Sequence, residues 1–477
     1  MSVVLPQEFI ANMRQLLGAE RFAVFADAMH CEPPVSVRLN PFKAPLSGLG
    51  LGRTMRGFDA AVPWAPEEGA YLLERPPFTF DPLFHAGAYY VQEASSMFLH
   101  HALKAYQTRP ATVLDLCAAP GGKSTLLRSL LPNGSLLVAN EVMSKRVGTL
   151  LQNVVKWGHA DVVITNSRAQ DFAALPHFFD LILADVPCSG EGMFRKDGQA
   201  VEQWSLENVR LCSSRQREIV RAVWPSLKPG GLMVYSTCTF NTHENEDNVR
   251  WIADELGAEV VEVNVDPKWG ILGNLPEEIE AKVPIYRFLP GLIRGEGFFL
   301  AVLQKGEKTM DSGYSAAVRK KDVRHSTPVP PVCKSWLLNP DEFIYRTYGS
   351  SCYAVRAVHI DKVEMLRKAV RVVGAGIKLC EQKGNVVVPS HALAMSLDFN
   401  RDSFPEMEVS YDMALTYLCK KTFIANSGTE KGIVTVVYQN LPLGFVKNLG
   451  TRVNNLYPLE CKIRTSFLTN YKLRTDF

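Results

Sequence analysis

Apolar and polar positions follow a regular order between residues 111 and 305. Short, nearly continuous apolar segments such as "ATVLDLC", "SLLVANE", "DVVITN", "FDLILADVPC" and "GLMVYSTC" are separated by segments with helical spacing, such as "SKRVGTLLQNVVKWG" and "SSRQREIVRAVWPSL". Strands that are apolar on both faces and alternate with helices are typical of a parallel sheet covered on both sides. The pattern predicts a doubly wound, Rossmann-like α/β domain, in which ligands sit beyond the carboxyl ends of the strands.

The pattern changes on both sides of this region. The N-terminal part predicts a helix from Leu5 to Leu17 and an extended "VSVRLN" stretch, which suggests a small α+β accessory module. The polar, proline-ended stretch "KGEKTMDSGYSAAVRKKDVRHSTPVPP" is typical of a linker. Segments such as "GIVTVVYQNLPLGFVKNLG" predict a β-rich fold after it. The division expected from the sequence is 1–85, 86–305, 306–331 and 332–477.

Composition and charge narrow the function classes. Hydrophobic residues make up 47% of the chain and charged residues 21%, as in soluble globular proteins. The net charge is only +3, but residues 306–477 carry 24 Lys and Arg against 16 Asp and Glu. This basic surplus suits a polyanionic partner. No apolar run reaches the roughly 18 residues of a membrane span, and the N-terminus lacks a signal-peptide pattern, so we expect a cytoplasmic protein without membrane contact.

The ten cysteines show no Cys-x-x-Cys pair, so we expect no zinc site and no other metal. In a reducing compartment most of them should be small buried apolar residues. A catalytic cysteine must therefore be distinguished by its neighbours.

The loop "LDLCAAPGGKST" follows the first predicted strand and leads into a helix. It ends like a phosphate-binding loop, but the first glycine of that motif is replaced by Cys117. The dinucleotide pattern Gly-x-Gly-x-x-Gly also cannot be placed on it. Small residues at a helix N-terminus favour a compact ligand with one negative end.

Glu141 ends the next predicted strand, where doubly wound proteins hold the two hydroxyls of a ribose. Together with the glycine loop it indicates an adenosine-type cofactor without phosphates. We therefore predict S-adenosylmethionine, with its carboxylate at the glycine turn. Lys123 could bind this carboxylate or an RNA phosphate, and we favour the cofactor.

Two cysteines and one carboxylate end the fourth and fifth predicted strands. Asp185 and Cys188 lie in "ADVPCSGEGMFRK", and Cys238 lies in "YSTCTFNTHENEDN". Carbon 5 of a pyrimidine becomes nucleophilic only after a thiolate attacks carbon 6. Asp185 next to nitrogen 3 would stabilise the developing charge, and a base must later remove the carbon 5 proton. The residues alone leave open which cysteine attacks.

These segments resemble a known family. "VLDLCAAPGGKS", "DVPCSGEG", "YSTCTFNTHENEDNV" and "GEGFFLAVLQK" are similar to the motifs of RNA 5-methylcytosine methyltransferases of the NOL1/NOP2/Sun family, in particular the bacterial 16S rRNA branch. With "RLNPFK" upstream, the resemblance covers roughly residues 35–305. The segment "LPLGFVKNLGTRVNNLYPLECKIR" resembles the PUA-like RNA-binding module of bacterial rRNA members.

The resemblance implies a role for each matched residue. Cys238 corresponds to the nucleophile, Cys188 to the cysteine that assists product release, and Asp185 to the residue at nitrogen 3, also near the methionine part of the cofactor. The implied partner is RNA, most simply rRNA in a ribosomal subunit or assembly intermediate, bound by a monomer. The implied cofactor contacts, besides Asp185, are Cys117, Ala118, Ala119, Pro120, Gly121, Gly122, Lys123, Glu141 and Arg146.

Two departures from the family and three rival functions remain. The family often carries a histidine in the stretch before "GEGFF", whereas this chain has "RFLPGLIRGEGFF", so no catalytic role is assigned there. The family often holds the adenine amino group with an acidic residue after the third strand, whereas this chain has "TNSRAQDF", where Asn166 or Ser167 could substitute. A nucleoside triphosphatase is disfavoured by Cys117 in place of glycine. A non-catalytic ribosome-assembly factor is disfavoured by the presence of both cysteines and Asp185. A tRNA substrate stays an alternative, because the chemistry on the base would be the same.

Overall fold

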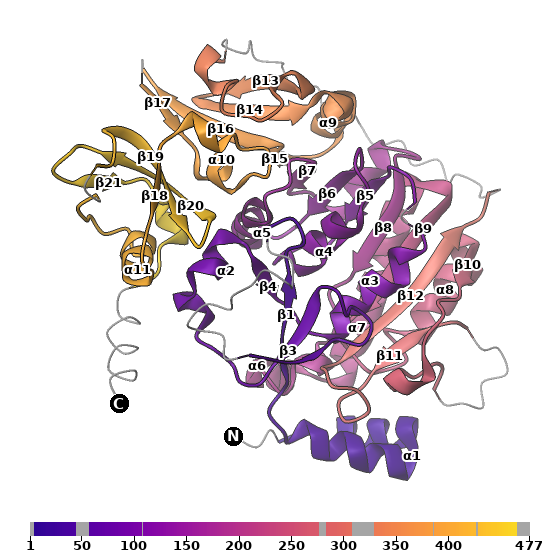
Figure 1. Cartoon of the computed structure of the whole chain (residues 1–477). Coiled ribbons are helices and arrows are strands. Elements are labelled where there is room, and N and C mark those ends of the chain that lie inside the picture. The colour runs from indigo at the N-terminus through magenta and orange to yellow at the C-terminus, as the bar shows by residue number, and fades with distance from the viewer. Residues whose placement is uncertain are drawn as a thin grey trace, which may run out of the picture.

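A nine-stranded sheet forms the centre of the protein (Figure 1). The computed structural model describes residues 4–43, 57–106, 108–275, 283–307, 329–384, 386–425 and 428–464. The strand order is β10-β12-β9-β8-β5-β6-β7-β15, and β11 pairs with β12. The strands are β5 (Thr112–Asp115), β6 (Leu136–Asn140), β7 (Val162–Thr165), β8 (Phe179–Asp185), β9 (Leu227–Thr237), β10 (Ala258–Val261), β11 (Tyr286–Phe288), β12 (Phe298–Lys305) and β15 (Val372–Ala375).

Helices cover both faces of this sheet, as the apolar pattern predicts. Neighbouring residues of β5 point to opposite faces, so Val113 packs with the helices of one side and Leu114 with those of the other. The first side has α3 (Phe98–Lys104), α4 (Gly122–Leu130) and α5 (Ser144–Trp157). The second has α7 (Leu206–Val223) and α8 (Glu246–Leu256). Among the described helices, none has the length and apolar character needed to cross a membrane.

The order in which the strands are added to the sheet reverses between β5 and β8. From β5 the chain continues outward through β6 and β7, and then returns to β8 and β9 on the other side of β5. β5, β6, β7, β8 and β9 pair in parallel, so their carboxyl ends lie at one edge of the sheet. A crevice opens where the order of a doubly wound sheet reverses. The loops after β5, β8 and β9 therefore meet at one place.

The N-terminal part forms a small α+β module. Helix α1 (Gln7–Met29) is kinked at Gly18, which has a φ of 72° and a ψ of 171°. The helix predicted over Leu5–Leu17 corresponds to the segment before this kink, and the helical continuation to Met29 was not predicted. A four-stranded sheet follows, in the order β2-β3-β1-β4. Its strands are β1 (Val35–Leu39), which lies in the predicted "VSVRLN" stretch, β2 (Phe58–Ala61), β3 (Gly69–Leu72) and β4 (Tyr89–Val91), and α2 (Pro82–Ala86) precedes β4.

The C-terminal part contains two four-stranded sheets, drawn in orange and yellow in Figure 1. One has the order β13-β14-β16-β17 and the other β18-β19-β20-β21. Their elements are β13 (Phe343–Tyr348), β14 (Ser351–Arg356), α9 (Ile360–Ala369), β16 (Ile377–Lys383), β17 (Val386–Pro389), α10 (His391–Met395), β18 (Glu406–Glu408), α11 (Tyr411–Leu418), β19 (Gly432–Tyr438), β20 (Leu441–Asn448) and β21 (Val453–Asn455). Most of the predicted linker, residues 308–328, lies outside the described residues.

One strand of the C-terminal part belongs to the central sheet. β15 pairs antiparallel with β7, with Ala375 opposite Val163 and Val372 opposite Thr165. The sequence pattern did not predict this pairing. The C-terminal part is thereby joined to the central sheet through backbone hydrogen bonds at the edge of that sheet.

Candidate active site

The loop after β5 holds its backbone close to the neighbouring strand β6. The Ala118 N–H donates to the Asn140 carbonyl at 2.8 Å, and the Asn140 side chain donates to the Leu116 carbonyl at 3.0 Å. Gly121, just before α4, has a φ of 115°, which other residues rarely adopt. A Cβ at Gly122 would lie 3.2 Å from the Tyr90 ring, so this ring packs against bare backbone. The first N–H groups of α4, which have no acceptor within the helix, begin at this loop.

Asp115 is fully buried at the end of β5. The Ser124 hydroxyl donates to its Oδ2 at 2.6 Å. Its Oδ1 accepts no hydrogen bond from the described residues. Burial raises the pKa of Asp115 to about 7, although the Ser124 hydroxyl acts in the opposite direction. A ligand that brings a donor or a positive charge to Oδ1 would favour the ionised carboxylate.

Glu141 and Arg146 connect the end of β6 to the same loop. Glu141 is 2% exposed; its Oε1 accepts from the Met143 N–H at 2.8 Å, and its Oε2 lies 3.3 Å from Arg146 Nη1. Arg146 also donates to the Ala119 carbonyl at 2.5 Å. Glu141 Oε2 accepts no hydrogen bond from the described residues. The residues therefore fit a ligand that offers hydroxyl donors at Glu141 and a compact polar end at the glycine turn.

Asn166 and Ser167, the two candidates for an adenine contact, already have protein partners. Asn166 Oδ1 accepts from the Ser144 hydroxyl at 2.9 Å and from Arg371 Nη1 at 3.1 Å. Its Nδ2 donates to the Glu141 carbonyl at 2.7 Å. Ser167 Oγ accepts from the Arg371 N–H at 2.9 Å. Both side chains thus attach the C-terminal part, through Arg371, to the end of β7.

Cys188 and Cys238 are in direct contact. Their Sγ atoms are 3.1 Å apart, because β8 and β9 pair in parallel and bring Asp185 opposite Ser236. Both thiols are partly exposed. The hydrogen bond to Cys238, together with burial, raises the pKa of the Cys188 thiol well above its usual range. Cys188 is therefore a protonated thiol at neutral pH that can donate to Cys238.

Asp185 lies between a lysine and a serine. Lys123 Nζ donates to its Oδ2 at 2.9 Å, and the Ser236 hydroxyl donates to its Oδ1 at 2.7 Å. Burial alone would lower the pKa of Lys123, but the charge of Asp185 and then that of Cys238 raise it above its usual value. Lys123 is thus a stable cation beside the carboxylate and the thiols, and its predicted contact with a cofactor stays a prediction.

Comparisons with known proteins match most of the chain. Family models match residues 5–94 as the N-terminal domain of 16S rRNA methyltransferase RsmF, residues 103–304 as 16S rRNA methyltransferase RsmB/F, and residues 404–461 as the methyltransferase RsmF PUA domain. The ribosomal RNA small subunit methyltransferase F of Enterobacter sp. is 31% identical over 479 residues, and the alignment covers 96% of both chains. The chain belongs to the ribosomal RNA small subunit methyltransferase F family. The protein from Cronobacter sakazakii is 30% identical, again over 96% of each chain.

Solved structures share the fold of this family member over about two thirds of its length. A methyltransferase homolog protein from Pyrococcus horikoshii is 29% identical with a TM-score of 0.55, and the match covers 64% of this chain and 96% of that one. NSun6 from the same organism, solved with SFG, has a TM-score of 0.52 at 21% identity, over 64% of this chain and 98% of that one. The motif resemblance, the Rossmann-like fold and an RNA methyltransferase activity are therefore confirmed.

Sequence reasoning missed three residues that shape the site of this methyltransferase F family member. Ser236 orients Asp185, Tyr90 covers the glycine turn, and Glu191 binds the backbone that follows Cys238. Ser236 could have been found from the alternation of β9, because it lies two residues before Cys238. Tyr90 reaches the glycine turn only through the packing of the N-terminal module against it. Glu191 lies three residues after Cys188, but its contacts with residues 240 and 241 depend on the pairing of β8 with β9.

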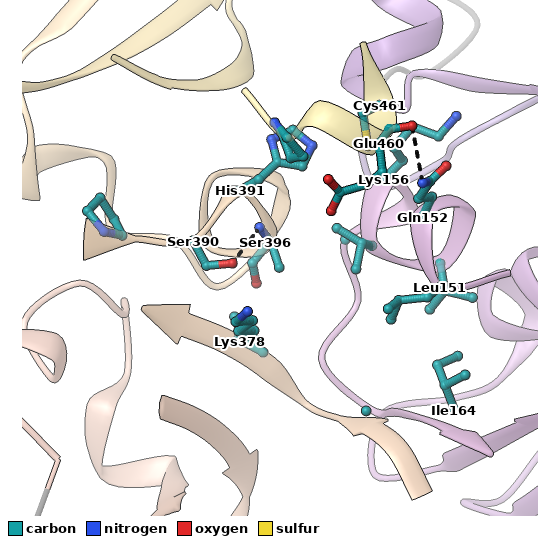
Figure 2. A pocket seen from close by; sticks show the side chains of 18 of the residues that line it. Leu151, Gln152, Lys156, Ile164, Lys378, Ser390, His391, Ser396, Glu460 and Cys461 are labelled. Carbon is teal, nitrogen blue, oxygen red and sulfur yellow. Dashed lines mark hydrogen bonds between the residues drawn. The ribbon is translucent and has the colours of Figure 1, made fainter. Parts of the chain in front are cut away.

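One cavity among the described residues lies apart from the two cysteines and Asp185. It has a volume of about 830 Å³ and is bordered by α5, β7, α10 and the segment 456–461. Figure 2 shows Leu151, Gln152 and Lys156 of α5 on one side and Ser390, His391 and Lys378 on the other. Gln152 donates to the Glu460 carbonyl at 3.5 Å. None of the predicted catalytic residues lines this cavity, so the candidate active site is placed at the strand ends by its chemistry.

Proposed function

We propose that this chain transfers a methyl group from S-adenosylmethionine to carbon 5 of a cytidine in 16S rRNA, through a covalent bond between Cys238 Sγ and carbon 6. The observation that carries the proposal is the pair of thiols, with Sγ atoms 3.1 Å apart, next to the buried loop after β5. The names of the relatives support an rRNA substrate. The PUA domain match and the basic surplus of residues 306–477 support binding to RNA.

The loop 117–123, Glu141 and Asp115 are the residues that would hold the cofactor. S-adenosylmethionine, when bound, supplies a methyl group on a positively charged sulfur. Glu141 Oε2 and Asp115 Oδ1 are both buried acceptors that accept no hydrogen bond from the described residues, and they suit ribose hydroxyls and an ammonium group. Arg146, which contacts both Glu141 and Ala119, keeps the two parts of this site together.

Cys238 begins the reaction when its thiolate gives an electron pair to carbon 6 of the cytosine. The electrons of the double bond between carbons 5 and 6 move toward nitrogen 3 and carbon 5, so carbon 5 can attack the methyl group. Asp185 takes a proton from the Lys123 ammonium that donates to its Oδ2 and passes it to nitrogen 3, which stabilises the developing charge. The Lys123 ammonium, whose interaction with Cys238 is favourable, stabilises the thiolate before the attack.

Cys188 assists the release of the product. After methyl transfer, carbon 5 carries both a proton and the new methyl group. A base removes the proton, its electron pair re-forms the double bond, and the carbon 6–sulfur bond breaks to return the Cys238 thiolate. The hydrogen bond that Cys188 donates to Cys238 contributes most to the raised pKa of Cys188, and it weakens once Cys238 becomes a thioether, whose sulfur is a poorer acceptor than a thiolate. The pKa of Cys188 therefore falls at this stage, so that its thiol can give its proton to solvent and the resulting thiolate can accept the carbon 5 proton.

Trapping with an RNA that contains 5-fluorocytidine tests the nucleophile. A carbon 5 fluorine cannot leave as a proton does, so the covalent adduct should persist. We expect peptide mass spectrometry to find the adduct at Cys238 in the presence of S-adenosylmethionine and none in a Cys238→Ala variant. An adduct at Cys188 instead would overturn the assignment.

The release role of Cys188 gives a second, independent outcome. Cys188→Ala should still attack carbon 6 and accept the methyl group, but it should accumulate a covalent complex with ordinary, unfluorinated RNA. Denaturing gel electrophoresis detects this complex directly. Normal turnover without a complex would contradict the role.

The substrate is tested by transfer of a labelled methyl group. We expect single-turnover transfer to 16S rRNA, free or in the small subunit, and no comparable transfer to a tRNA pool. Preference for tRNA would move the chain to the alternative substrate. Binding of rRNA without any transfer would identify a non-catalytic assembly factor that retains the fold.

A further inference from the structure

A buried carboxylate from the loop of Cys188 holds the loop of Cys238. Glu191, in the 3-10 helix η5 (Glu191–Met193), is 1% exposed. Its Oε2 accepts from the N–H groups of Phe240 at 2.6 Å and Asn241 at 3.0 Å, and from the Thr239 hydroxyl at 2.5 Å. Its Oε1 accepts from the Trp204 indole N–H at 2.9 Å. One side chain therefore binds all three residues that follow Cys238.

A second buried carboxylate makes the reciprocal contact. Glu244, six residues after Cys238, is fully buried, and its Oε2 accepts from the Ser189 N–H at 3.0 Å. The side chain of Gln216 donates to the same oxygen at 2.7 Å. Asn241 Nδ2 lies between the two carboxylates and donates to Glu244 Oε1 at 2.8 Å and to Glu191 Oε1 at 3.1 Å. Each cysteine loop thus supplies an acceptor for the backbone of the other loop.

The two loops also touch directly through backbone. The Gly192 N–H donates to the Cys238 carbonyl at 2.8 Å. A Cβ at Gly192 would lie 2.7 Å from that carbonyl oxygen and 2.9 Å from the Gly297 Cα. The Ser189 and Thr239 hydroxyl oxygens are 2.9 Å apart. The carboxylates therefore act on loops that are already in contact, where a small shift would change the distance between the thiols.

Buried carboxylates are an unusual means of packing two loops. Burial penalises ionised groups strongly, and it raises the pKa of Glu244 even against its hydrogen bonds. Apolar side chains of similar volume would fill the space at lower cost, but they would leave the N–H groups of Phe240, Asn241 and Ser189 without acceptors. Successive N–H groups that point to one side form a site for an anion. The carboxylates fix the direction of the backbone, which an apolar contact does not.

We propose that Glu191 and Glu244 are positioning residues that keep Cys188 Sγ and Cys238 Sγ in contact, and that this contact sets the rates of attack and release in the proposed reaction. The inference rests on the proposed function for its catalytic consequence. Its structural half, the distance between the two thiols, is independent of any reaction with RNA. We name the pair of side chains Glu191 and Glu244 the carboxylate brace.

The rate at which the two thiols are oxidised in the free enzyme tests the effect of the carboxylate brace without RNA. Diamide oxidises two adjacent thiols to a disulfide and is itself reduced to the hydrazine. We expect the Cys188–Cys238 disulfide, quantified by peptide mass spectrometry, to form roughly 10- to 100-fold more slowly in Glu191→Ala and Glu244→Ala than in the natural sequence. Glu191→Gln should lie between, because an amide offers only one acceptor oxygen to the donors around it.

Adduct formation with 5-fluorocytidine RNA measures the catalytic consequence. At saturating S-adenosylmethionine, we expect the rate of adduct formation to fall roughly 10- to 100-fold at most. As for the disulfide rate, the loss should be smaller in the glutamine variants than in the alanine variants. Binding of S-adenosylmethionine should remain unchanged, since neither carboxylate lies in the loop 117–123. A parallel loss of both rates would show that the brace acts through the position of the thiols.

A buried carboxylate far from the thiols controls for lost stability. Asp161 is 4% exposed and pairs with Arg356 at 3.0 Å in the contact with the C-terminal part. Asp161→Asn should lower the melting temperature but leave both rates unchanged. Natural rates of disulfide and adduct formation in Glu191→Gln and Glu244→Gln would overturn the brace. If no enzyme forms an adduct but the disulfide rates still fall in the brace variants, the proposed function fails and the brace stands.

Discussion

The two sides of the central sheet's ligand edge are built in different ways. On one side, the loops after β5, β8 and β9 carry the candidate chemistry, and each lies within a few residues of a predicted strand end. On the other, the end of β7 is completed by Arg371, which is more than 200 positions away along the chain and contacts Asn166 and Ser167. The first side follows from local sequence and parallel pairing. The second depends on where a distant module docks.

The residues proposed for catalysis therefore lie on one side of the ligand edge, and the residues that attach the C-terminal part lie on the other. Residues at the ends of adjacent parallel strands are brought together by the register of the sheet, as Asp185 and Ser236 are. An edge strand such as β15 can be supplied by any segment with free backbone groups, so its identity is not fixed by β7 itself. Variants should therefore affect the chemistry strongly on the first side and weakly on the second.

The largest effect is expected from Asp185→Asn. The amide can still accept from the Ser236 hydroxyl, but it loses the charge that pairs with Lys123 and cannot share a proton with nitrogen 3. We expect methyl transfer in single turnover to fall by at least about 100-fold, as for loss of a general acid–base group. The melting temperature should change little, because the side chain is 28% exposed.

An ion pair at the opposite end of β8 provides the control for this variant. Asp180 pairs with Lys228 at 2.6 Å, and both side chains are partly exposed. Asp180→Asn removes a carboxylate from the same strand without touching the thiols. It should transfer methyl groups at the natural rate. Equal losses in the two variants would mean that the strand, and not its carboxyl end, determines activity.

Much of the site could be predicted from the sequence because its parts are local. The apolar segments located the strands, and the residues just after them, Asp185, Cys188 and Cys238, meet because parallel strands share one edge. The glycine loop was distinguished from a phosphate-binding loop because Cys117 occupies the position where that motif needs glycine. The Arg146 contact with the Ala119 carbonyl is a detail that this reasoning did not reach.

The carboxylate brace and β15 could not be predicted, for a physical reason. Glu191 and Glu244 look like ordinary charged loop residues, and only their burial among backbone N–H groups gives them a role. β15 is a short segment whose partner lies in another module, and neither hydropathy nor spacing names that partner. Helix α1 was predicted only in part. The segment before the kink at Gly18 was predicted, but the continuation to Met29 has no strong apolar periodicity.

A smaller effect on stability is expected from Asp115→Asn. The pKa of Asp115 rises from 3.8 to about 7 on folding, chiefly through burial. The folded state therefore favours the protonated form. The resulting stabilisation is complete below pH 3.8, and it is lost as the pH rises toward 7, because the unfolded chain ionises first. Asparagine keeps an acceptor for Ser124 and has no charge to bury.

The measurement for Asp115→Asn is thermal unfolding of the free protein across this pH range. We expect the variant to gain on the order of 1–4 kcal/mol relative to the natural sequence at pH 8, and to lose this advantage toward pH 4. Asp180→Asn should follow the natural pH profile. A constant difference between Asp115→Asn and the natural sequence at every pH would exclude an ionisation of Asp115 in this range.

The smallest effect should come from Arg371→Ala, on the attached side of the ligand edge. The Arg371 backbone contacts with Asn166 and Ser167 remain, and only the hydrogen bond from its guanidinium to Asn166 Oδ1, 3.1 Å long, is lost. Since Asn166 also binds the Glu141 carbonyl, we expect cofactor affinity, measured by calorimetry, to weaken about two- to fivefold, the value of one hydrogen bond. Arg346→Ala, which changes a partly exposed arginine of β13, should leave the affinity unchanged. A loss as large as that from Asp185→Asn would show that the docked module takes part in the chemistry, and the two sides of the edge would then be one unit.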